Sequence, residues 1–136
     1  MADLSITAAN VKSSGGSKGK NGTAGAAVTA GQLVYLEASS GTYKLADSNS
    51  GTAEARSPDG IALNNAAAGQ PLRVHTEGPI TIGATLTAGV AYYASGTAGG
   101  ICPVADLTTG HYPTIVGIAK SSSVLDVKFH ESGVAL

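Results

Sequence analysis

Short apolar runs alternate with Gly, Pro, Asn and Asp along most of the chain. From residue 28 onward a run recurs about every ten residues, a spacing typical of an all-β sandwich or barrel. In residues 124–130, Leu, Val and Phe alternate with Asp, Lys and His, the pattern of a half-buried strand. Residues 54–56 and 64–68 are the candidates for a helical turn. The predicted strands are 3–8, 32–37, 43–46, 60–63, 72–76, 80–83, 90–94, 101–105, 114–119 and 124–130.

The second half of the chain repeats short motifs of the first half in the same order. The matching segments are 29–35 with 87–93, 60–62 with 117–119, and 72–75 with 127–130. We therefore expect two pseudo-repeats, at about 29–78 and 87–133, each supplying about four strands. The fold class expected is all-β, a small β-barrel or β-sandwich built from these two pseudo-repeats. Both arrangements protect strand edges, and the sequence leaves the choice between them open.

Residues 12–27 have a different texture, because they are rich in Gly and Ser and contain no acidic residue. Such a segment has little apolar surface to bury, so the sequence predicts a flexible N-terminal arm. The expected organisation is an N-terminal strand and arm over residues 1–27, followed by a β-barrel-like domain over 28–136. The three lysines of the arm, Lys12, Lys18 and Lys20, would suit an acidic protein surface. The alternative is an ordinary solvated loop.

Small side chains dominate the composition: Gly, Ala, Ser and Thr together make up half of the chain. There is no Trp, and there is one Phe. Because large apolar side chains contribute most of the free energy of burial, we expect a lone monomer to be only moderately stable. Association with other copies or with a partner would add to that stability.

Charge and cysteine content narrow the function classes. The formal net charge is −1 and the pI is near 6.2, so no global basic field favours nucleic acid. One cysteine excludes an internal disulfide framework and a cysteine-based zinc site. No apolar run is long enough for a membrane helix, and the N-terminal residues do not resemble a secretory signal. We expect synthesis in a reducing cytoplasm, with no cofactor, no metal, no nucleic acid and no membrane as partners.

Candidate catalytic residues are weak, and the sequence predicts no enzyme. Ser17 lies in the letters of a nucleophile elbow, G-x-S-x-G, but inside a Gly/Ser tract without the strand and helix that an elbow needs. His75 and His130 occupy matching places in the repeats, and polar positions on the solvent side of equivalent strands are favoured over a metal pair. Cys102 is expected to be a small buried side chain, because no histidine partner is evident.

Two tyrosines at matching places in the repeats, Tyr35 and Tyr93, are expected in the core or at a subunit interface. The N-terminal strand adds two apolar side chains that a partner would contact. The candidate capsid- or subunit-binding residues are Leu4, Ile6, Lys12, Lys18, Lys20, Tyr35 and Tyr93.

The segment Gly60–Gly78, GIALNNAAAGQPLRVHTEG, resembles the signature of tailed-bacteriophage capsid cement proteins, also called head decoration proteins. In that family an apolar strand, an Ala-rich turn, a polar strand and a Gly follow in this order. Residues 88–93 and 116–129 are similar to the same family, and the likeness covers about residues 28–133. The long Lys/Gly/Ser arm departs from the family's pattern, so the family's mode of docking is not carried over.

The resemblance implies a small β-barrel-like module on the exterior of a phage capsid, made in the bacterial host cytoplasm and carried on the virion. It implies a homotrimer that binds the major capsid protein and stabilises the shell, without catalysis. A head- or tail-fibre module that binds a host-surface receptor or glycan is the alternative function. A small hydrolase using Ser17 is the third hypothesis.

Overall fold

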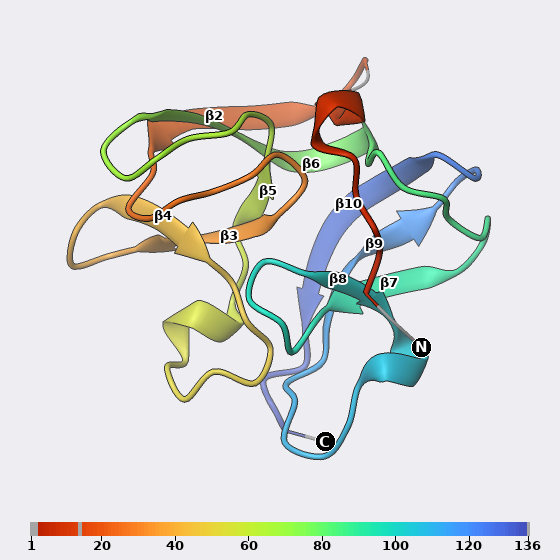
Figure 1. Ribbon diagram of the computed structural model, residues 1–136. Coiled ribbons are helices and arrows are strands. Elements are labelled where there is room, and N and C mark those ends of the chain that lie inside the picture. Colours follow the sequence, from red (N-terminus) through yellow and green to blue (C-terminus); the bar gives the residue numbers. More distant parts are fainter. Residues whose placement is uncertain (1–2, 14, 136) are drawn as a thin grey trace.

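The computed structural model describes residues 3–13 and 15–135, so residues 1, 2 and 14 of the predicted arm and residue 136 lie outside the described residues. The all-β prediction is confirmed: the described residues form a curled antiparallel sheet with three short 3-10 turns (Figure 1). The strands are β1 Lys12–Ser13, β2 Lys18–Thr23, β3 Leu33–Glu37, β4 Thr42–Leu45, β5 Gly60–Ala62, β6 Pro71–Thr81, β7 Ala91–Ala94, β8 Ile101–Pro103, β9 Thr114–Ala119 and β10 Val124–Glu131. The 3-10 turns are η1 Ala8–Asn10, η2 Glu54–Arg56 and η3 Val104–Asp106.

The order of strands is the same in the two halves of the sheet. The first half-sheet runs β4-β3-β5-β6 and the second runs β8-β7-β9-β10. The registers also match, because Val34 pairs with Gly60 in the first half and Tyr92 pairs with Gly117 in the second. The two pseudo-repeats read from the sequence therefore correspond to two half-sheets with one pairing scheme.

The equivalence of the two histidines is wrong. His75 pairs with Ile61, and the residue that pairs with the equivalent Ile118 is Asp126. His130 lies further along β10, beyond an irregularity in its register with β9. The sequence match of residues 72–75 with residues 127–130 was therefore in the wrong register. Short stretches of alternating apolar and polar residues can be matched in several registers.

Strand β6 belongs to both half-sheets. Its first part pairs with β5 and β2, and its last part pairs with β10 and β1. The register with β2 slips at Thr76, because Lys18 pairs with Glu77 while Gly19 pairs with His75. Such a bulge bends a strand and re-aims its side chains, so β6 turns from one half-sheet into the other. Two strands predicted separately, 72–76 and 80–83, are thus one long bent strand.

Two clusters of apolar side chains form the core. The smaller cluster lies inside the first half-sheet and includes Val34, Tyr43 and Val74. A bridge between Ala24 and Tyr43 brings the end of β2 to β4, so this half-sheet curls round the smaller cluster. The larger cluster joins the two half-sheets. The curled sheet with one half packed against the other resolves the choice between barrel and sandwich as a half-barrel.

The prediction of a flexible arm is wrong for much of residues 12–27. β1 and β2 pair along β6 from Thr81 to Pro71, although most of their side chains are exposed. Gly22 lies so close to Tyr43 that a Cβ there would collide with the ring carbon Cε2. Backbone pairing and this close approach, rather than apolar burial, hold the segment, which is why its composition was misleading.

The N-terminal strand predicted over residues 3–8 is also not formed. Residues 3–7 are extended, but their backbone hydrogen bonds go to different elements: the Leu4 amide donates to the Ile101 carbonyl and the Thr7 amide to the Gly83 carbonyl, both at 2.8 Å. The segment therefore crosses the second half-sheet as a strap, seen in red in Figure 1. Of the two candidate helical turns, 54–56 forms a 3-10 turn and 64–68 does not.

Candidate interaction surface

The three lysines of the predicted arm lie on β1 and β2, along one edge of β6. All three are exposed. The ammonium of Lys18 is 3.3 Å from Oε2 of Glu77, and both side chains are largely in solvent. Exposed ion pairs contribute little to stability, so the lysines remain available to a partner. They are held on a strand rather than on a mobile segment.

The apolar candidates are divided between core and surface. Leu4 and Ile6 pack partly buried against the larger cluster, where they fasten the N-terminal strap to the core. Tyr35 is buried in the larger cluster, so its assignment to a binding surface is wrong. Tyr93 is half-buried and stays a candidate for contact. The two tyrosines match in the repeat but differ in what covers them.

Each half-sheet has two faces, which we define by residues of strand β3 in the first half and of strand β7 in the second. The front face carries Val34 in the first half and Tyr92 in the second. The back face carries Leu33 in the first half and Ala91 in the second. Both front faces and the back face of the first half contribute buried side chains to the two core clusters. The back face of the second half is left for the solvent.

Exposure along this back face is concentrated on β9 and β10. Ile118 is 53% exposed, and it pairs with Asp126 across the strands. A hollow of about 270 Å³ lies beside it, with Gly117 offering no side chain to fill it. Its remaining lining comes from Ile115, Asp126, Lys128, Phe129 and His130. A neighbouring hollow shares Lys128 and Phe129 and adds Leu36, which is 41% exposed.

Another hollow lies between the N-terminal strap and the turn before β10. It measures about 610 Å³ and is lined mainly by Ser, Thr and small residues, such as Ser5, Thr81 and Ser122. Lys12 is the one titratable side chain among the described residues that line it. The hollow therefore offers hydroxyl and amide contacts, with no pair of groups suited to acid-base chemistry.

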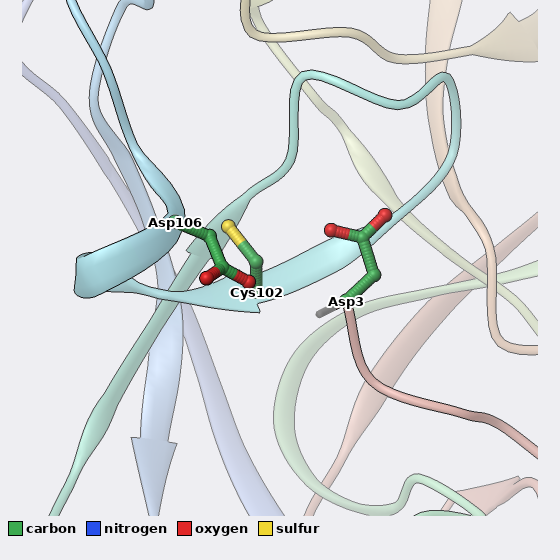
Figure 2. A group of neighbouring side chains, drawn as sticks. All are labelled: Asp3, Cys102 and Asp106. Atoms are coloured by element: carbon green, nitrogen blue, oxygen red, sulfur yellow. The ribbon is translucent and has the colours of Figure 1, made fainter. Parts of the chain in front are cut away.

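Cys102 lies on β8 close to two carboxylates, Asp3 of the strap and Asp106 of η3 (Figure 2). One possible ligand atom from each side chain lies within 4.8 Å of the others. Burial, followed by the charges of the two aspartates, raises the pKa of the Cys102 thiol to about 12. The thiol is thus protonated near neutral pH and is a poor nucleophile.

The surroundings of Asp3 give this cluster a structural role. Its Oδ1 accepts a hydrogen bond of 2.6 Å from the Ser95 hydroxyl, which in turn accepts one from the Thr97 amide. The network fastens the strap to the loop between β7 and β8. Among the described residues, Asp3, Cys102 and Asp106 are the one group of three possible metal ligands that lie close together.

His75 is buried, so the prediction of a solvent-facing position is wrong for it. Its Nε2–H donates to the Gly78 carbonyl at 2.8 Å, which leaves Nδ1 to accept from the Ser13 hydroxyl at 2.7 Å. Burial lowers the pKa of His75, so the ring is neutral near pH 7. It ties β1 to the bulge of β6. His130 is exposed on β10 and does not meet His75 across a strand pair.

Ile118 and Phe129 were not among the candidates drawn from the sequence. The signal was present, because Gly117–Ala119 repeats Gly60–Ala62. The repeat indicates that Ile118 is equivalent to Ile61, but it does not say which of the two faces solvent. That difference depends on how the half-sheets pack.

No protein-family model matches the chain, and no curated protein matches it. No helix among residues 3–13 and 15–135 is long and apolar enough to cross a membrane.

Proposed function

We propose that this chain is a structural virion protein that binds the outer surface of a phage capsid and stabilises the shell. The observation that carries the proposal is the lysine edge, formed by Lys12, Lys18 and Lys20 on strands β1 and β2. An ordered strand presents these charges in a fixed row, so little conformational entropy is lost on docking. The resemblance of residues 60–78 to capsid cement proteins gives the partner: the major capsid protein, contacted by a homotrimer on the capsid exterior.

Stabilisation follows from mass action. A protein that binds the assembled shell but not its separated subunits lowers the free energy of the shell by its binding free energy. Many copies act at once, and a trimer engages several capsid subunits, so modest contacts suffice. This task needs a rigid surface rather than reactive groups. The protonated thiol of Cys102 and the neutral, hydrogen-bonded His75 are compatible with it.

The test is co-sedimentation with expanded capsids of the phage that encodes the chain, assembled without it. We expect the wild-type chain to pellet with the capsids and to raise the temperature at which they release DNA. The variant Lys18→Glu/Lys20→Glu should bind at least tenfold more weakly, since two attractive contacts become repulsive. Lys120→Glu, in the exposed turn between β9 and β10, is the matched control and should bind normally.

Failure of the wild-type chain to bind these capsids would overturn the proposal. Equal losses from Lys120→Glu and from the edge variant would overturn the role of the lysine edge. Raising the salt concentration should weaken wild-type binding more than binding of the edge variant, because exposed charges are screened.

A further inference from the structure

The back face of the second half-sheet combines an apolar centre with charges of both signs. Ile118 and Ile115 of β9 lie beside Asp126, Lys128 and His130 of β10. The hollow between them is open to solvent, and Gly117 contributes only backbone to it. Exposed apolar side chains gathered round a hollow and rimmed by polar groups mark interaction sites more often than scattered ones do.

In the first half-sheet, the equivalent back face is buried against another β-sheet. Its back face carries Leu33 and Ile61, and both side chains are fully buried in the larger cluster. By strand register these residues are equivalent to Ala91 and Ile118. The second half-sheet covers the back of the first, and no described segment covers Ile118 in the same way. A β-rich surface from another molecule is the natural cover.

The charges indicate which molecule this is. Asp126 and Lys128 lie two residues apart on β10 with opposite signs. When two copies meet with their β10 strands antiparallel, Asp126 of one can lie against Lys128 of the other, and the reverse. A partner of one charge sign would repel one of the two. The adjoining hollow also carries both signs, with Lys20 near Asp59 and Glu77. A surface of mixed sign is complementary to itself.

We propose that a second copy of this chain docks on the back face of the second half-sheet, with Ile118 as its apolar anchor. Because each copy offers the same face to the other, this contact has two-fold symmetry and is separate from the threefold contact of the trimer that the proposed function includes. It is tested in solution without capsids, so its failure is distinct from a failure to bind the shell.

The first experiment is light scattering on a gel-filtration column over a range of concentrations. The wild-type chain should show a mass of about twice 13.3 kDa that falls on dilution, because the proposed contact pairs two copies. Ile118→Glu should remain near 13.3 kDa at concentrations where the wild-type chain associates. Val104→Glu is the matched control, because Val104 is 57% exposed on η3, and it should associate like the wild-type chain.

Three results would overturn the proposal: a wild-type chain that is monomeric throughout, an Ile118→Glu variant that keeps the wild-type mass, or a Val104→Glu variant that dissociates to the same extent. Far-ultraviolet circular dichroism of each variant establishes that it is folded. Because Ile118 is largely in solvent, its substitution should leave the spectrum unchanged.

A charge exchange provides the second measurement. Lys128→Asp should raise the dissociation constant between copies by about tenfold, because two acidic groups then face each other. Adding Asp126→Lys to the same chain restores opposite signs and should return the constant to within about threefold of wild type. A double variant as weak as the single one would show that these charges do not meet across the contact.

Discussion

The back faces of the two half-sheets carry equivalent residues in opposite surroundings. Ile61 has no exposed surface, whereas Ile118 is 53% exposed, although both follow a Gly and precede an Ala in the same register. The equivalent tyrosines differ in the same direction, because Tyr35 is buried and Tyr93 is only half-buried. The repeated strand pattern therefore sets the pairing within each half-sheet, while packing between the halves decides which face meets solvent.

The sharpest test of this comparison is to shorten both isoleucines. Ile61→Ala should destabilise the fold by about 2–5 kcal/mol, because it removes a fully buried side chain and leaves a cavity. Ile118→Ala should change the free energy of unfolding by less than about 0.5 kcal/mol in the monomer, since solvent already covers much of it. Urea unfolding at low protein concentration measures both. Similar losses would mean that the two faces are not differently covered.

Substitutions of the glycines beside these isoleucines should lower stability by similar amounts. They test the strand register that the two half-sheets share. A Cβ on Gly60 would lie 2.6 Å from the His75 carbonyl oxygen, and one on Gly117 would lie within 3.0 Å of the β10 backbone at Asp126 and Val127. Gly60→Ala and Gly117→Ala should each cost about 1–3 kcal/mol, since backbone must move. Gly51→Ala, which meets nothing within 4 Å, is the control. Thermal unfolding measures these losses of stability. A loss in only one of the two variants Gly60→Ala and Gly117→Ala would contradict the shared register.

The buried histidine of β6 makes the stability of the first half-sheet depend on pH. Burial lowers the pKa of His75, so the folded state resists its protonation. Its contribution to stability is complete above the pKa of the unfolded chain, near 6.5, and is lost as the pH falls through the lower folded value. The wild-type urea midpoint should therefore drop between pH 7.5 and pH 5.

Substitution assigns this pH dependence to one ring. His75→Gln should flatten the pH dependence, because the amide keeps a donor for Gly78 without titrating. A His75→Gln variant with the full wild-type slope would show that other groups are responsible.

The smallest effect should come from the edge strand. Lys18→Ala removes an ion pair whose partners are both largely exposed, and it should change the free energy of unfolding by about 0–1 kcal/mol. A larger loss, measured by the same urea titration, would show that β2 is held by its charge rather than by its backbone. Ser17→Ala, which removes a neighbouring side chain without changing charge, is the control.

The sequence predicted the strands with apolar alternation and the order in which they repeat. It did not predict β2, because KGKNGT has neither alternation nor apolar side chains and is held by backbone pairing with β6. It also treated Glu77 to Pro79 as a break, whereas β6 passes through them with a bulge at Thr76. The exposure of Ile118 could not be predicted from the sequence, because the residues that bury one face of a strand are distant in the chain.

Strand β6 has a consequence for how the molecule comes apart. Eleven consecutive residues hold hydrogen-bonded neighbours from both half-sheets, so neither half can open fully without removing partners from the other. The repeated chain should therefore melt in one cooperative transition rather than as two separate units. Amide hydrogens along Val74–Ile80 should exchange among the slowest in the protein, at a rate governed by global unfolding.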